Sequence, residues 1–195
     1  MKIIGLTGGI GSGKSTVSAY LRQKGIPILD ADAIVMQAEA KNSPHFPAIV
    51  NILGREVLTP DGELDRKLVS KLVFANPEKL KALNAIVYAC VEEARIKLLA
   101  EKKDEKVVVF DVPLLIECNW HKKVDEVWLV SVDKGTQITR AMARSKISRE
   151  EVEKRMEHQM PLAEKKKYAD VVLDNSGSIA HLQAQVDAAL NKIES

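Results

Sequence analysis

The sequence has few cysteines, no surplus of charge of either sign and no long apolar run. Its two cysteines, Cys90 and Cys118, are far apart and lack metal-ligand spacing, which argues against a disulfide-stapled secreted scaffold. Twenty-nine basic residues face 27 acidic ones, so the net charge of +2 carries no nucleic-acid-binding signature. These absences favour a protein of a reducing, cytoplasmic setting without a nucleic-acid partner.

The apolar segments are too short for a membrane protein or a secreted precursor. The longest run, 107–116, is interrupted by Asp111 and Pro113, whereas a membrane-spanning helix needs about 20 apolar residues. The apolar segment near the N-terminus reaches glycines after about four residues, which is shorter than the apolar core of a signal peptide. We therefore expect a cytoplasmic location and no membrane partner.

Short apolar runs alternate with helical patterns along the 195 residues, a length that suits one domain. Strands are predicted over 2–7, 26–30, 107–112, 127–132 and 170–173. Because these runs are nearly continuous in apolar residues, they are typical of a parallel sheet covered on both faces. The predicted fold class is α/β with a five-stranded parallel sheet.

Helix starts and faces are also marked in the sequence. Three pairs predict helix N-termini: Ser43-Pro44, Asn76-Pro77 and the capping box of Ser148 with Glu151. Apolar residues at 3-4-3-4 spacing predict one face of a long helix: Leu80, Leu83, Val87, Cys90 and Ala94.

The intervals between strands divide the chain into a core and two additions. About 75 residues separate the second and third strands, far more than a crossover needs, so 32–105 is expected to be a helical insert. A second helical stretch, 136–168, is expected to be a mobile cover. The segments 1–31, 106–135 and 169–195 would then form the core of the single domain.

Residues 8–15 fit the phosphate-binding pattern G-x-x-x-x-G-K-[ST], with a predicted strand before them and a predicted helix after. Glycines let such a loop turn its backbone N–H groups inward, while Lys14 reaches the β- and γ-phosphates and Ser15 can ligate Mg²⁺. The alternative is a glycine-rich turn that arose by chance. The predicted ATP-binding residues are Gly11, Ser12, Gly13, Lys14, Ser15 and Thr16. Because this loop faces its ligand, replacing Lys14 by alanine is expected to leave the fold intact.

Three carboxylates follow predicted strands at the edge of the sheet where ligands collect: Asp30, Asp32 and Asp111. Asp32 could accept a proton from an acceptor hydroxyl, while Asp111 or Asp30 holds a metal ion or its waters. The alternative for Asp30 or Asp32 is the N-cap of the next helix, a role that aspartate fills readily. Spacing alone leaves both interpretations of Asp32 open.

Arg140 and Arg144 lie one helical turn apart in the 136–168 segment. Arginines on a closing lid can stabilise the charge that develops during phosphoryl transfer. The alternative is a solvated basic face. The run Lys165-Lys166-Lys167 is interpreted as solvated surface.

Taken together, these motifs resemble those of the dephospho-coenzyme A kinase family over nearly the whole chain. The matching segments are GLTGGIGSGKST at 5–16, DAD at 30–32, GELDR at 62–66, VPLLIE at 112–117, QITRAMAR at 137–144, Gln159 and ADVVLDN at 169–175. DAD before a long helical insert, followed by PLLxE, is more selective than the phosphate loop, which many families share.

The resemblance implies a three-layer α/β/α P-loop kinase fold with a helical acceptor-binding insert and a helical lid. It also implies ATP and dephospho-CoA as substrates, with transfer of the γ-phosphate to the ribose 3′-hydroxyl in the last step of coenzyme A synthesis. By this likeness Asp32 is the general base, Arg140 acts near the transferred phosphate, and Arg66 helps to hold the acceptor. Lys14 would belong to the catalytic set, and Ser15, with Asp111 directly or through water, to the Mg²⁺ site.

Three positions depart from the family's pattern. Met36 stands where the family usually has Arg or His, and Tyr88-Ala89 stands where it usually has His-Pro. Asp111 precedes VPLLIE, a position that is not acidic in every member. The first two departures concern acceptor recognition and not the phosphate chemistry.

Two rival functions share the phosphate loop. One is a P-loop kinase for another nucleoside, nucleotide or small alcohol, which only the helical insert could distinguish. The other is a nucleotide-dependent switch, for which a GTPase would show an N-K-x-D motif; the segment 174–177 has the wrong order. Nothing in the sequence indicates a protein partner or an oligomeric state.

Overall fold

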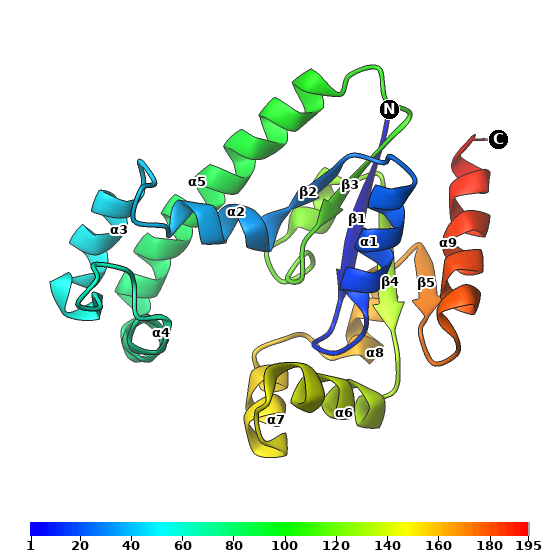
Figure 1. Cartoon of the computed structure of the whole chain (residues 1–195). Helices are drawn as coiled ribbons and strands as arrows, with labels where there is room; N and C mark the ends of the chain where they lie inside the picture. The colour runs from blue at the N-terminus through cyan, green and yellow to red at the C-terminus, as the bar shows by residue number, and fades with distance from the viewer. Residues whose placement is uncertain (195) are drawn as a thin grey trace. The chain divides into compact units, whose positions relative to one another are not determined.

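The computed structural model describes residues 1–194, except the side chain of Glu194 (Figure 1). No helix in this range is long and apolar enough to cross a membrane. The elements follow in the order β1 (Lys2–Gly8), α1 (Lys14–Gln23), β2 (Ile28–Asp30), α2 (Ala31–Ala38), α3 (Phe46–Leu53), η1 (Arg55–Val57), α4 (Arg66–Ala75), α5 (Pro77–Glu101), β3 (Val107–Asp111), η2 (Trp120–Lys123), β4 (Glu126–Ser131), α6 (Lys134–Ser145), α7 (Arg149–Glu157), α8 (Leu162–Lys165), η3 (Lys166–Tyr168), β5 (Val171–Asp174) and α9 (Ile179–Glu194).

The chain forms two compact units. The first, which we call the sheet unit, comprises Met1–Leu29 and Lys102–Ser195; the second, the helical unit, comprises Asp30–Glu101. The helical unit therefore begins two residues before the predicted insert, 32–105, and ends four residues before its end. The first boundary falls within β2, before its last residue Asp30, and the second falls directly after α5.

The sheet has the strand order β2-β3-β1-β4-β5, which confirms the predicted α/β class. β1 pairs in parallel with β3 and with β4, and β4 pairs in parallel with β5. Because parallel strands all end at the same edge, the loops that follow β1, β3, β4 and β5 emerge together. That edge is where the sheet unit carries its candidate site.

Each face of the sheet is covered by apolar side chains. On one face α1 and α9, blue and red in Figure 1, pack on a core of fully buried residues that includes Trp128 and Leu182. On the other face the segment after β3 supplies Leu115, which lies against Gly5, and Trp120, whose ring meets Phe110 edge-on. Burial on both faces explains the nearly continuous apolar character of the strands.

In the helical unit, α3, α4 and α5 enclose a small core formed by Ile49, Leu53, Val57, Val73 and Leu83. The predicted cap of α5 is confirmed, because Asn76 accepts a hydrogen bond from the backbone N–H of Lys79 at 3.1 Å.

The helix start predicted at Ser43-Pro44 is wrong. The Ser43 hydroxyl accepts from the His45 N–H at 3.1 Å, which closes a local turn instead of reaching a helix's third residue. The helix α3 begins later, at Phe46, and its early proline is Pro47.

The predicted lid segment contains α6, α7 and α8. The capping box at the start of α7 is confirmed: Ser148 accepts from the Glu151 N–H, and the Glu151 carboxylate accepts from the Ser148 N–H. Ile138, Ala141 and Val152 form a small core between α6 and α7. The two helices form one packed layer of the sheet unit.

Candidate active site

The phosphate loop joins β1 to α1 at the carboxyl edge of the sheet. Gly11 and Gly13 have φ values of 71° and 94°, a left-handed conformation that side chains other than glycine rarely adopt. A Cβ on Gly11 would collide with the Gln137 carbonyl, and one on Gly13 would collide with the Asn175 side chain. Gly13 is also the N-cap of α1 and supplies no side-chain cap, so the N–H groups of Lys14 and Ser15 remain for an anion, while the Thr16 N–H donates to the Gly13 carbonyl at 2.9 Å.

Asp111 ends β3 beneath this loop and holds two partners from α1. Its carboxylate forms an ion pair with Lys14 and accepts a hydrogen bond from the Ser18 hydroxyl. The Asp111 side chain is 4% exposed and that of Lys14 is 17% exposed, so the pair is largely shielded from water. Lys14 is therefore held beside the loop by a buried countercharge, which a nucleotide phosphate could replace.

Arg140 of α6 reaches the loop through Asn175, the first residue after β5. Its Nη2 donates to the Asn175 carbonyl at 3.2 Å, and Asn175 Nδ2 donates to the Ser12 carbonyl at 2.8 Å. Two buried polar atoms at this place, Arg140 Nη1 and Ser12 Oγ, have no hydrogen-bond partner among residues 1–194.

The two lid arginines thus differ. Arg144 lies near the end of α6 and is exposed, which agrees with the alternative of a solvated basic face. Arg140 is half-buried and directed at the phosphate loop.

The interpretation of Lys165 as solvated surface is wrong. Its side chain is fully buried, pairs with Glu117 at 3.0 Å and donates to the Pro113 carbonyl at 2.9 Å. Burial lowers the pKa of Lys165, and the neighbouring Glu117 carboxylate opposes that shift. Glu117 also accepts from the Met160 N–H at 2.9 Å, so this pair ties the end of the lid segment to the loop after β3.

In the helical unit, the two aspartates of the DAD motif have separate positions. Asp30 is the N-cap of α2 and accepts from the Ala33 N–H at 3.1 Å. Asp32 lies in the first turn of α2 and is exposed. The capping role that spacing had left open between them belongs to Asp30, and the Asp32 carboxylate lies on the surface.

Arg66 is the first residue of α4, whose N-cap is Asp65. Its positive charge acts on Glu39, which follows α2: burial raises the pKa of the Glu39 carboxyl, and Arg66 partly offsets that rise. Since α2 rises about 1.5 Å per residue, Glu39 lies about 10 Å along the chain direction of this helix from Asp32.

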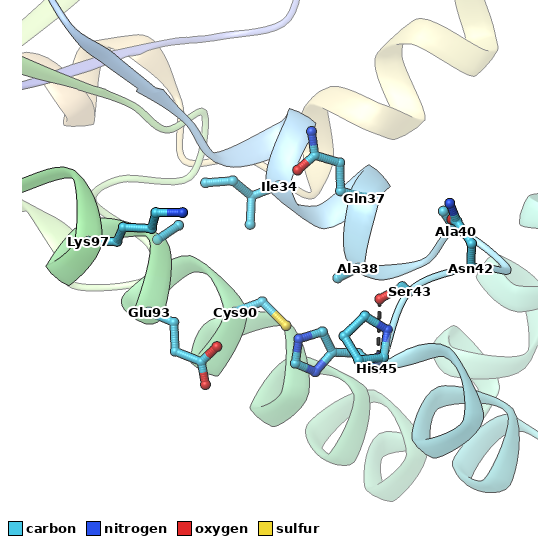
Figure 2. Close-up of a pocket in the computed structure, with 12 residues that line it drawn as sticks. Ile34, Gln37, Ala38, Ala40, Asn42, Ser43, His45, Cys90, Glu93 and Lys97 are labelled. Atoms are coloured by element: carbon cyan, nitrogen blue, oxygen red, sulfur yellow. Dashed lines mark hydrogen bonds between the residues drawn. The ribbon is translucent and has the colours of Figure 1, made fainter. Parts of the chain in front are cut away.

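The helical unit also contains a cavity of about 510 Å³ between α2 and α5 (Figure 2). Its walls include Ile34 and Ala38 of α2 and Cys90 of α5, with His45 from the connecting segment. Ile34 and Ala38 are two and six residues after Asp32, so their side chains leave the helix on its other side. The cavity therefore lies on the face of α2 opposite to Asp32. This cavity is therefore separate from the surface around the candidate base.

The sequence model of the dephospho-CoA kinase family matches residues 2–181. A dephospho-CoA kinase of Streptococcus agalactiae is 44% identical over 193 residues, which cover 98% of this chain and 99% of the relative. The chain belongs to the dephospho-CoA kinase family. One from Symbiobacterium thermophilum is 48% identical and covers 97% of this chain and 80% of the relative.

Solved structures share the fold of this chain. A Thermus thermophilus crystal structure superposes with a TM-score of 0.85 at 39% identity, covering 98% of this chain and 97% of that one. A dephospho-CoA kinase from Campylobacter jejuni, at 23% identity and a TM-score of 0.69, shares the fold. The chain is thus an ATP-using kinase with the fold expected of one.

Three residues beside the phosphate loop were given no role by the sequence interpretation: Ser18, Asn175 and Gln137. Ser18 lies four residues after Lys14, so a polar residue one turn further along a mostly apolar helix face was a usable signal. Gln137 and Asn175 lie in segments that match the family, but they meet the loop through tertiary contacts, which their spacing in the sequence does not predict.

Proposed function

We propose that this protein transfers the γ-phosphate of ATP to the ribose 3′-hydroxyl of dephospho-CoA, the last step of coenzyme A synthesis. The observation that carries the proposal is 44% identity to a dephospho-CoA kinase over 98% of the chain, with the phosphate loop intact. The cytoplasmic location and the residue roles below stay predictions of the same proposal.

In the sheet unit, backbone N–H groups of residues 11–16 would bind the phosphates. Those of Ser12 and Thr16 donate to the Gly9 and Gly13 carbonyls and would exchange these bonds for phosphate oxygens. Lys14 would leave Asp111 for the β- and γ-phosphates, since a doubly charged phosphate competes well with one carboxylate. Arg140, with its unpartnered Nη1, would stabilise the charge that grows on the transferred group. These residues act on the phosphates in place, without a covalent enzyme intermediate.

The residues present fit a Mg²⁺ ion of the kind that phosphates bring with them. The Ser15 hydroxyl at the start of α1 and the Asp111 carboxylate at the end of β3 are oxygen donors, which Mg²⁺ prefers. Within residues 1–194, no three His, Cys, Asp or Glu side chains gather as a metal cage. The ion would take its remaining ligands from phosphate and water, and would neutralise charge during transfer.

In the helical unit, Asp32 would accept the proton of the 3′-hydroxyl as its oxygen attacks the γ-phosphorus and ADP leaves. Met36, one turn further along α2, is 54% exposed on the same face. Where the family usually places a cation, this chain therefore presents an apolar contact. Arg66, at the start of α4, would bind an acidic group of the acceptor.

The 32–105 segment would serve as the acceptor-binding insert and the 136–168 segment as the lid. The packed pair of α6 and α7, which carries Arg140, suits a cover that moves as one body. By excluding water it would protect the γ-phosphate from hydrolysis.

The proposal is tested by steady-state assays with ATP and a panel of acceptors: dephospho-CoA, nucleosides, nucleoside monophosphates and small alcohols. We expect a kcat/KM for dephospho-CoA well over about tenfold above any other acceptor, because a pocket that hydrogen-bonds its substrate rejects analogues strongly. A preference below tenfold would assign the chain to another P-loop kinase activity. Transfer that requires a protein partner would instead point to a switch.

A further inference from the structure

Two glutamines hold a single residue of the phosphate loop by both of its backbone polar groups. Gln137 Nε2 donates to the Ile10 carbonyl at 2.8 Å, and the Ile10 N–H donates to Gln159 Oε1 at 3.0 Å. Gln137 belongs to α6 and is 3% exposed, while Gln159 follows α7 and is half-buried. Both belong to the segment expected to be the lid.

The polarity of each bond is fixed by chemistry. A backbone N–H can only donate, so Gln159 must present its oxygen, and a backbone carbonyl can only accept, so Gln137 must present its amide nitrogen. A carboxylate could therefore replace Gln159 and keep its bond, but could not replace Gln137. This asymmetry makes the arrangement testable residue by residue.

The side chain of Ile10 is held as well. It packs on the small core between α6 and α7, which contains Ile138, Ala141 and Val152. Ile10 is thus anchored by its N–H, its carbonyl and its side chain to one layer of helices. Its N–H, engaged by Gln159, is not available to a phosphate.

We propose that Gln137 and Gln159 are positioning residues that set the shape of the phosphate loop before ATP arrives. Gly8, Gly9, Gly11 and Gly13 give this loop many conformations, and ordering them on binding would weaken affinity. Fixing the peptide groups on both sides of Ile10 aligns the N–H groups of residues 11–16 that follow. The inference rests on the ATP-binding half of the proposed function and not on the identity of the acceptor.

The test measures the Kd of Mg²⁺–ATP by calorimetry without acceptor, in the full chain. Gln137→Met and Gln159→Met remove one bond each at similar volume, and each is expected to raise the Kd about tenfold. Gln23→Met, at the exposed end of α1, is the matched control and should leave the Kd within about twofold. In turnover assays the loss should appear in the KM for ATP, with the KM of the acceptor unchanged.

The decisive pair is Gln137→Glu against Gln159→Glu. Both add the same charge beside Ile10, so repulsion of ATP by that charge is common to the two variants. Gln159→Glu still accepts from the Ile10 N–H, whereas Gln137→Glu sets a carboxylate against the Ile10 carbonyl. We expect Gln137→Glu to bind ATP at least about fivefold more weakly than Gln159→Glu.

Equal Kd values for the two glutamate variants would overturn the proposal. So would methionine variants that melt at lower temperature but bind ATP as tightly as the parent, because that result describes a purely structural role. A parent chain that binds ATP but phosphorylates another acceptor would refute the proposed function and leave this test intact.

Discussion

The sheet unit and the helical unit present their candidate residues in opposite ways. In the sheet unit, Lys14 and Arg140 are tied to buried partners, Asp111 and Asn175. In the helical unit, Asp32, Met36 and Arg66 are all exposed. The residues expected to handle ATP are thus held in place by the protein, whereas those expected to meet the acceptor are displayed on its surface.

The chemistry of the two ligands accounts for this difference. A triphosphate is bound largely by backbone N–H groups, whose directions depend on the whole loop, so the loop must be fixed from all sides. An acceptor is bound by side chains, which adjust one at a time. Nucleotide binding by the sheet unit therefore depends on how its loop is packed. Acceptor binding by the helical unit depends on which side chains lie on its surface.

The largest expected effect is on kcat and comes from a substitution in the helical unit, at Asp32. Asp32→Asn should lower kcat by about 10²–10⁴, the range for loss of a general base, with the KM for ATP little changed. Its melting temperature should stay close to that of the parent, because Asp32 is exposed and Asp30 caps α2. Near-normal turnover of this variant would mean that Asp32 is not the base.

In the sheet unit, Lys14→Ala should lower kcat/KM for ATP by about 10²–10³, as expected for the loss of one strong phosphate contact. The expectation that this variant keeps its fold stays a prediction, but the ion pair with Asp111 predicts a loss of stability. Removing Lys14 leaves the Asp111 charge buried beside Ser18 alone, and breaking such a pair costs about 3–5 kcal/mol.

A double variant separates the two consequences of losing Lys14. Lys14→Met with Asp111→Asn removes both charges, so thermal unfolding should recover much of the lost stability while ATP binding stays weak. Stability that remains as low as in Lys14→Ala would show that the ion pair is not the cause.

Substitution of one buried leucine in each unit compares the stability of the two cores. Leu6 in β1 and Leu53 in α3 are both fully buried. Replacing either by alanine should destabilise the protein by about 2–5 kcal/mol, with Leu6 nearer the upper limit because the sheet between its helices cannot collapse into the cavity. Denaturant unfolding measures this difference.

The same two variants should also differ in ligand binding. Leu53→Ala should raise the KM for dephospho-CoA and leave the Kd of ATP unchanged, whereas Leu6→Ala should weaken ATP binding. If Leu53→Ala weakened ATP binding instead, the division of labour between the units would be wrong.

The features that the sequence predicted depend on neighbours along the chain. The five strands appear in the sequence as short apolar runs, the phosphate loop as a fixed spacing of glycines with Lys14 and Ser15, and the caps at Asn76 and Ser148 as residue pairs at most three positions apart. Ser43-Pro44 failed for the same reason: a serine hydroxyl can close a short turn as readily as it can cap a helix, and the local pattern does not distinguish the two.

The features that escaped prediction depend on partners far along the chain. Lys165 lies in a run of three lysines, and only its pairing with Glu117, 48 residues earlier, takes it out of solvent. The family resemblance selects Arg140 and not Arg144, but no local pattern shows that Arg140 donates to the Asn175 carbonyl. Such pairings follow from the strand order, because parallel strands bring their carboxyl ends together, and no local pattern records which side chains then meet.

The smallest expected effect concerns the charge between α2 and α4 in the helical unit. Burial raises the pKa of Glu39, so the folded state holds its proton more tightly than the unfolded state does. The stability from this group is present below its ordinary pKa and is lost as pH rises through the raised value. Glu39→Gln removes that loss.

Thermal unfolding from about pH 4 to about pH 7 should therefore show Glu39→Gln gaining about 1–2 °C on the parent as pH rises. Because Arg66 opposes the shift, Arg66→Gln should steepen the parent's decline over the same range. A gap that is constant with pH would mean that Glu39 is solvated in solution. In that case the Glu39 carboxylate also belongs to an exposed surface. The helical unit would then differ even more from the sheet unit, whose charged residues have buried partners.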